Sequence, residues 1–281
     1  MTPLLVFDIE TVPDVAGIRR LHDIDASVDD AGVVAWFMQR RRAATGGDFA
    51  PLHLQKVVAI ACALRDAAGL RVWSIGDASD DEPELIRRFF DGIERYTPQL
   101  VSWNGGGFDL PVLNHRALIH GVPAAKYWDW GDDDREFKFN NYLQRFHTRH
   151  LDLMDVVAQF QIRASAGLDA IARLCGFPGK LGMAGSDVGA AIAAGRIHDV
   201  RSYCECDVLN TYLVYQRFRL MRGELDAGEY AREISIARER VGTSDAAHWR
   251  AFMAAWDGAA DDSHATASTV VRTSADRDRS R

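Results

Sequence analysis

The 281-residue chain has no long apolar run, only four cysteines, and fewer basic than acidic side chains. No stretch approaches the roughly 18 consecutive apolar residues of a membrane span, so we expect no membrane segment. The N-terminal residues MTPLLVFDIE place two acids where a signal peptide needs its apolar region, which predicts a cytoplasmic protein. The cysteines lack the spacing of a disulfide framework, and we expect reduced thiols. If residues 204–206 are helical, the side chains of Cys204 and Cys206 point in different directions. We therefore interpret them as core side chains rather than half of a zinc site.

The charge balance is acidic, with a formal net charge of -7 at pH 7. This value argues against a protein that coats nucleic acid through bulk electrostatics. It does not exclude an enzyme that cleaves nucleic acid, because acids that bind cations are neutralised by them. Local basic patches can still contact a phosphate backbone.

The order of the predicted elements indicates an α/β or α+β sandwich. Strand patterns come first, strands and helices then alternate, and the chain beyond about residue 150 is almost wholly helical. The first three strands would form a meander, and the predicted strands cover residues 4–10, 56–64, 70–76 and 99–105. The predicted helices cover residues 81–96, 109–121, 151–162, 167–176, 186–194 and 197–222.

Two segments fall outside this pattern. Residues 14–50 form a polar, partly helical excursion to which the motifs assign no role. Residues 258–281 are rich in Asp, Ser, Thr, Ala and Arg without periodicity, which is typical of disorder. We therefore expect one domain over residues 1–257 and a disordered tail over 258–281.

Asp8 and Glu10 form a D-x-E pair on the first predicted strand. Strand alternation sends both carboxylates to the same face. Two like charges near a core repel each other and lose hydration, so the pair favours a cation between them. Alone it is weak evidence, because Asp80 and Glu82 repeat the spacing at a helix start, where capping explains it. The apolar strand before Asp8 distinguishes the two cases.

Asp109 follows a predicted strand and a glycine-rich turn in SWNGGGFDLPVL. One interpretation is that the glycines shape the turn and Asp109 caps the next helix. The other is that the glycines let a substrate approach, while Asp109 reaches the carboxyl end of a strand, where α/β sites usually lie. Asn104 can hold the turn or touch substrate.

Tyr203 and Asp207 lie one helical turn apart in YCECD, on the same face of a predicted helix. Taken alone, Tyr203 is better explained as a core tyrosine, and chance supplies a Y-x-x-x-D about once in such a chain. The order of this pair behind the D-x-E pair and Asp109 favours a shared site.

These motifs resemble a known superfamily when taken in order. D-x-E, then N-x-x-x-F-D about a hundred residues on, then Y-x-x-x-D about a hundred further, resemble the DEDD superfamily of 3′-5′ exonucleases, which have a ribonuclease H-like fold. Within it, FDIET, WNGGGFDLPVL, HLDLMDV, GFPGK and YCECDVLNTYLVYQRF are similar to predicted exonucleases related to the proofreading domain of family B DNA polymerases. The similarity covers about residues 1–257. Ser202 stands where the histidine branch has its key residue, so the chain resembles the tyrosine branch.

The resemblance implies a fold and a set of residue roles. The fold is α/β, a ribonuclease H-like mixed sheet flanked by helices with a helical C-terminal half. Tyr203 would orient the attacking water, and three further residues would contact substrate: Asn104, Phe108 and Thr11. The implied metal ligands are Asp8, Glu10, Asp109 and Asp207. The polymerase half of a family B enzyme is absent, so we expect no proofreading in cis.

The implied activity is metal-dependent hydrolysis of phosphodiester bonds at the 3′ end of single-stranded nucleic acid. It would release nucleoside monophosphates, with DNA favoured over RNA, and the protein would work beside replication or repair proteins. We expect two Mg²⁺ or Mn²⁺ ions, because hard oxygen ligands suit these metals and no His or Cys stands beside the acids to favour zinc. The alternatives are a non-catalytic nucleic-acid-binding module with a nuclease-like fold, and a phosphatase-type metalloenzyme, which the Tyr203–Asp207 pair disfavours.

Residues 126–149 interleave seven aromatic with five basic side chains. The segment suits stacking and phosphate contacts with a single strand, and it equally suits a loop that covers the core. We interpret His150 as a satisfied, partly buried histidine rather than a general base. Asp152 and Asp155 are interpreted as acids that support the ligands or start a helix rather than as ligands themselves, and the arginines at 40–42 as a solvated helix face.

Overall fold

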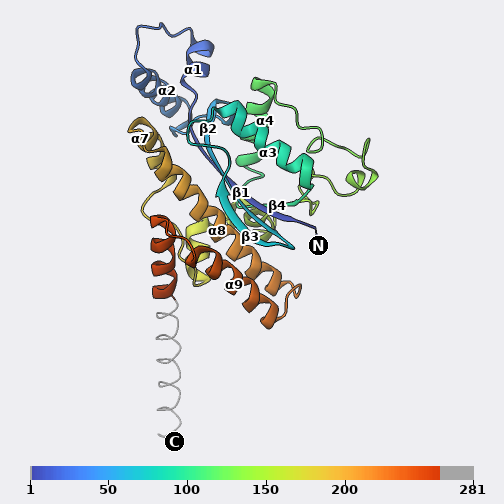
Figure 1. Ribbon diagram of the computed structural model, residues 1–281. Coiled ribbons are helices and arrows are strands. Elements are labelled where there is room, and N and C mark those ends of the chain that lie inside the picture. Colours follow the sequence, from blue (N-terminus) through green and yellow to red (C-terminus); the bar gives the residue numbers. More distant parts are fainter. Residues whose placement is uncertain (1, 260–281) are drawn as a thin grey trace, which may run out of the picture.

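The computed structural model describes residues 2–259, and within this range the strands form one mixed sheet with the order β3-β2-β1-β4-β5 (Figure 1). β1 pairs antiparallel with β2, and β2 pairs antiparallel with β3, which confirms the predicted meander. β4 pairs parallel with β1 and with β5. The strands are β1 (Leu4–Pro13), β2 (Gln55–Asp66), β3 (Gly69–Ser74), β4 (Gln99–Ser102) and β5 (His150–Asp152).

Helices cover both faces of the sheet, as predicted for an α/β protein. The labelled helices are α1 (Val15–His22), α2 (Asp30–Thr45), α3 (Glu82–Tyr96), α4 (Asp109–His120), α5 (Leu153–Val157), α6 (Leu168–Leu174), α7 (Val188–Ala193), α8 (Ile197–Met221) and α9 (Ala227–Gly242), and a further helix covers residues 247–259. α3 and α4 pack on one face of the sheet, and α8 crosses the other face with α6 and α9 against it. None of these helices is long and apolar enough to cross a membrane.

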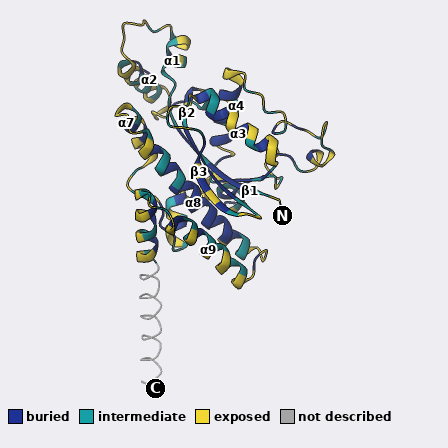
Figure 2. Cartoon of the chain, viewed as in Figure 1, coloured by how far each residue is buried: buried dark blue, intermediate teal, exposed yellow. Residues whose placement is uncertain are grey.

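β1 is buried over most of its length (Figure 2), and its alternation divides its side chains between two cores. Leu5, Phe7 and Ile9 point into the cluster under α3 and α4. Leu4 and Val6 point into the cluster under α8. Asp8 and Glu10 continue this second face by the same alternation, so the strand carries both carboxylates toward α8.

Three expectations need correction. Residues 150–152 form the buried strand β5, not the start of a helix, because three residues are too few to show an alternating pattern. The helix expected over 151–162 spans only Leu153–Val157, since the chain turns at Gln159 and Phe160, whose φ angles are +50° and +61°. The final helix covers 247–259, so residues 258 and 259 are helical. The rest of the predicted tail, 260–281, lies outside the described residues.

The excursion between β1 and β2 folds into α1 and α2, which project past one end of the sheet (Figure 1). Its small core contains Ile18, Val33 and Phe37. Asp14 fixes the start of this segment, because its main-chain N–H donates to Leu54 O at 2.8 Å and its side chain accepts from Gly17 N at 3.0 Å.

Candidate metal centre and active site

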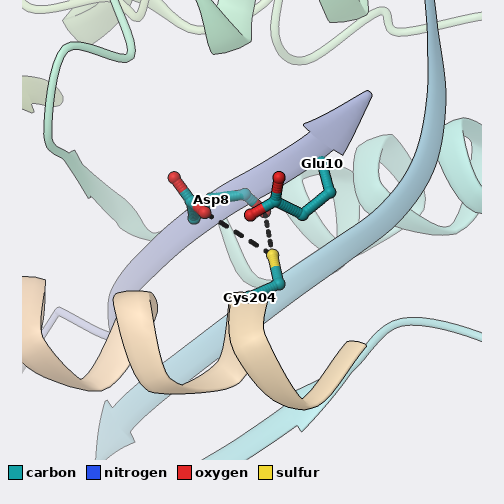
Figure 3. A group of neighbouring side chains, drawn as sticks. All are labelled: Asp8, Glu10 and Cys204. Atoms are coloured by element: carbon teal, nitrogen blue, oxygen red, sulfur yellow. Dashed lines mark hydrogen bonds between the residues drawn. The ribbon is translucent and has the colours of Figure 1, made fainter. Parts of the chain in front are cut away.

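Asp8 and Glu10 meet Cys204 of α8 at the carboxyl-terminal half of β1 (Figure 3). One ligand atom from each of the three residues lies within 4.8 Å of the others. The strand partners of the two acids in β2 are Ala61 and Ala59, whose small side chains leave room for α8 to approach. The prediction that both carboxylates leave the strand on one face is confirmed.

Cys204 is the first site neighbour that sequence analysis missed. Its Sγ lies 3.4 Å from the carbonyl oxygen of Asp8 and 3.6 Å from Asp8 Oδ2, in donor geometry. Burial, followed by repulsion from the surrounding carboxylates, raises the pKa of the Cys204 thiol well above its ordinary value. The thiol is therefore a neutral donor to Asp8, and a neutral thiol is a poor metal ligand. The expectation that no cysteine stands beside the acids was wrong, although the buried, unpaired state predicted for Cys204 is confirmed.

Asp109 begins α4 and is tied to β1. Its Oδ1 accepts a hydrogen bond from Ile9 N at 3.1 Å, between the two acids of the D-x-E pair. The side chain is buried, and burial raises the pKa of Asp109 to about 7. α4 shows no side-chain cap at Phe108, so capping explains little of this residue. Asp109 instead joins the β4–α4 turn to the site.

The glycines before Asp109 permit a tight turn. A Cβ atom on Gly105 would lie 2.2 Å from Ser102 Oγ, so any larger residue clashes there. Asp152 shapes the same turn from β5, where its two carboxylate oxygens accept from Asn104 N and Gly106 N, each at 2.9 Å. Asn104 adopts φ of +65° within it. Asp152 also caps α5 by accepting from Asp155 N at 3.3 Å, which agrees with its interpretation as a helix-start acid.

Tyr203 and Asp207 project from one face of α8 toward Lys180, as their spacing predicted for a shared site. Lys180 Nζ donates to the Tyr203 hydroxyl oxygen and lies 3.1 Å from Asp207 Oδ2. The other oxygen, Asp207 Oδ1, is buried and has no hydrogen-bond partner among the described residues. A buried carboxylate oxygen without a donor is costly unless a cation or water completes it.

Lys180 is the second residue that sequence analysis did not place in the site. It stands in the GFPGK loop, which Asn210 of α8 clamps by two hydrogen bonds. Asn210 Oδ1 accepts from Gly179 N at 3.1 Å, and Asn210 Nδ2 donates to Gly179 O at 2.8 Å. The sequence signal for this contact was Asn210, three residues after Asp207. The sequence alone does not show which loop this side chain binds.

The acids share one electrostatic field. The pKa of Asp8 is raised by burial first, then by repulsion from Asp109, Glu10 and Asp207. Burial and Asp207 likewise raise the pKa of Glu10. Burial also raises the pKa of Asp207, although Lys180 opposes that shift. Burial opposes the charged state of Lys180, but Asp207, Asp8 and Glu10 together outweigh it and raise the lysine pKa. One ammonium therefore interacts with three of the carboxylates, and the negative charge that remains favours bound cations.

Two of the predicted substrate residues lie at the edge of this cluster. Thr11 follows Glu10 after a shift in the β1–β2 register, and its Oγ1 donates to Gln55 Oε1 at 2.9 Å. The ring of Phe108 lies 5.8 Å from that of Phe49, centre to centre.

The aromatic segment divides between core and surface. Tyr127, Phe137 and Tyr142 are buried, as expected for a loop that covers the core. Trp128 and Trp130 are exposed and line a groove of about 800 Å³ that also reaches Asn104. His150 is buried with its Nε2 2.8 Å from Ser102 Oγ, and burial lowers its pKa to about 4. It is therefore neutral at pH 7, as its structural interpretation requires.

Comparison with known proteins identifies the family. The model of a family described as a predicted 3′-5′ exonuclease related to the exonuclease domain of PolB matches residues 47–256. The chain belongs to this family. The match confirms the resemblance drawn from the motifs. It begins after Asp8 and Glu10, so the place of these two acids beside α8 rests on the structure and the first motif.

The chain also resembles parts of large polymerases. Over 69 residues it is 35% identical to the catalytic chain of DNA polymerase epsilon from Dictyostelium discoideum, which is 24% of this chain and 3% of that protein. The structure of the family B DNA polymerase from the hyperthermophilic archaeon Pyrobaculum calidifontis aligns with a TM-score of 0.46 at 18% identity. That alignment covers 85% of this chain and 27% of the polymerase. The chain thus spans only a small part of either polymerase.

Proposed function

We propose that this protein is a metal-dependent 3′-5′ exonuclease that releases nucleoside monophosphates from single-stranded nucleic acid, with DNA favoured over RNA. The family supports exonuclease chemistry. The observation that carries the proposal is the convergence of four acids from β1, α4 and α8: burial raises the pKa of each, and repulsion from the other acids adds to this for Asp8 and Glu10. Such repulsion costs stability unless cations offset it, so the cluster is better explained by function than by packing.

The residues present fit divalent cations. The acids that would hold them are Asp8, Glu10, Asp109 and Asp207, and Asp207 Oδ1 is buried without a donor among residues 2–259. Oxygen donors suit Mg²⁺ and Mn²⁺ rather than softer metals. When bound, two such ions activate the attacking water, neutralise phosphate oxygens and stabilise the leaving 3′ oxygen.

The side chains of the protein orient the reacting groups and balance the negative charge of the site. The pKa of Tyr203 is raised by burial first and then by Asp207, so its hydroxyl keeps its proton and acts as an orienting group rather than a base. Lys180 donates to the Tyr203 oxygen, so the hydroxyl proton remains to be donated, either to the neighbouring Asp207 or to a water or phosphate oxygen. The lysine ammonium supplies a fixed positive charge beside the acids.

The test is cleavage of 5′-labelled single-stranded DNA and RNA with Mg²⁺ or Mn²⁺. A ladder that shortens from the 3′ end is expected, and Asp207→Asn should abolish it. The matched control is Asp199→Asn, since Asp199 lies on the same helix but is 56% exposed and pairs with Arg196. Binding without products would instead support the nucleic-acid-binding module, and phosphate release from free nucleotides would support a phosphatase.

We also propose that the protein works in the cytoplasm beside replication or repair proteins. The test is crosslinking in intact cells followed by identification of the recovered proteins. Recovery without any replication or repair protein would contradict this proposal and leave the exonuclease assignment unaffected.

A further inference from the structure

The α1–α2 segment, which the motifs leave without a role, brings an aromatic ring to the start of α4. Phe49 follows α2, and its ring centre lies 5.8 Å from that of Phe108 at an interplanar angle of 53°. Phe108 immediately precedes Asp109. Phe49 is nevertheless 60% exposed, so the contact leaves most of its surface open to solvent.

Hydrogen bonds on both sides hold Phe49 in place. Its carbonyl oxygen accepts from Arg41 Nε of α2 at 3.3 Å. The next residue, Ala50, is buried in the α1–α2 core, and its carbonyl accepts from Gln55 Nε2 at 2.9 Å. The same Gln55 accepts from Thr11, next to Glu10. The exposed ring therefore sits on a fixed backbone that is linked to the acid cluster.

Positive charge gathers in the C-terminal half of α2, although residues 14–50 as a whole hold six acids and five arginines. Between residues 31 and 56 there are four cations, Arg40, Arg41, Arg42 and Lys56, and a single acid, Asp48. Asp48 pairs with Arg42 at 2.5 Å. Arg40 lies on the exposed face of Trp36, with its guanidinium 5.7 Å from the ring centre. A local cluster of cations at the end of α2, near an acidic site, suits a polyanion whose end reaches that site.

We propose that Phe49 and Phe108 form a stacking platform for one base of the single-stranded 3′ end, with the α2 arginines contacting phosphates further along the strand. This inference rests on the proposed function and extends it, because it assigns the α1–α2 segment to substrate binding. Stacking on an aromatic ring tolerates any base, so the platform holds a single strand without reading its sequence.

A double-mutant cycle tests the platform without relying on cleavage. Binding of labelled oligonucleotides is measured by anisotropy in the Asp207→Asn protein, with one abasic site moved through the last four positions. Phe49→Ala should weaken binding of the intact strand about 5- to 150-fold, and Phe49→Trp should restore it to within about threefold. At one abasic position the Phe49→Ala loss should disappear, because the base that stacks is already missing.

One control variant and one measurement of salt dependence make the result specific. Tyr96→Ala removes an aromatic side chain that is 43% exposed at the end of α3, outside the segments that could bind the strand, and it should leave affinity unchanged. Arg40→Gln should lower the slope of log affinity against log salt by about 0.7, the value for one phosphate contact on a single strand. Melting temperatures of all variants should match the parent, since each altered side chain is exposed.

The outcomes separate the two proposals. Equal Phe49→Ala losses at every abasic position, or no loss at all, overturn the platform even if wild-type protein degrades the strand. If the cycle shows the expected loss and recovery but the wild-type protein yields no cleavage products, the platform stands and the exonuclease assignment is overturned.

Discussion

Replacing Lys180 by Met should destabilise the metal-free protein and leave the Mg²⁺-bound protein nearly unaffected. In the absence of metal, the Lys180 ammonium lies 3.1 Å from Asp207 Oδ2 and compensates acids that burial already disfavours. Met keeps most of the side-chain volume and removes the charge. The acids would then repel each other with no cation among them.

The magnitude follows from the exposure of the two partners. Breaking a fully buried pair costs about 3–5 kcal/mol, whereas an exposed pair contributes about 0–1 kcal/mol. The side chains of Asp207 and Lys180 are 6% and 35% exposed, so an intermediate loss of about 1–3 kcal/mol is expected after allowing for solvent screening. At about 2–4 °C per kcal/mol for a domain of this size, the melting temperature should fall by about 2–12 °C.

The assay is thermal unfolding in EDTA and in saturating Mg²⁺, at pH 5 and at pH 8. Bound Mg²⁺ and protonation of the acids each remove the repulsion, so the loss should be largest in EDTA at pH 8. Lys126→Met is the matched control, because Lys126 is 21% exposed and lies 3.5 Å from the buried Asp129, outside the site. Its effect should not depend on Mg²⁺. An equal loss for Lys180→Met under all four conditions would refute the reasoning.

Further predictions concern the same site. Tyr203→Phe should keep metal binding but lower single-turnover cleavage about a hundredfold or more, and unchanged turnover with a lowered melting temperature would mark a core tyrosine. Asp109→Asn should abolish cleavage and raise the stability of the metal-free protein. The substitution removes an acid whose pKa is raised to about 7 but retains an oxygen that can accept from Ile9 N. Near wild-type turnover would contradict the assignment. The pKa of Asp109 is higher in the folded protein than in the unfolded chain, so the folded state keeps this proton to a higher pH. The free energy of unfolding of the metal-free protein should therefore fall as the pH rises from about 4 through 7. Urea titrations that show a rise would disprove this. Asn210→Ala should release the loop that carries Lys180, and its effect on turnover should largely overlap with that of Lys180→Met in the double variant.

Local patterns along the chain were enough to predict the sheet, the helical second half and the directions of the acids. Apolar alternation in LLVFDIE requires that Asp8 and Glu10 leave the strand together, and helical spacing requires that Tyr203 and Asp207 share a face. These are local rules of chain geometry, so they can be read without knowing what packs where. The short strand β5 escaped them because three residues carry no periodicity.

The packing of the folded chain, by contrast, established which residues from distant segments meet at the acids. Cys204 contacts Asp8 because α8 crosses β1 closely over the alanines of β2. Lys180 reaches Asp207 because Asn210 fixes a loop that has no regular pattern of its own. Phe49 meets Phe108 because the α1–α2 segment, which has a small core of its own, returns the chain to the start of α4. Contacts of this kind depend on packing between elements far apart in sequence, and neither periodicity nor residue type within one segment specifies them.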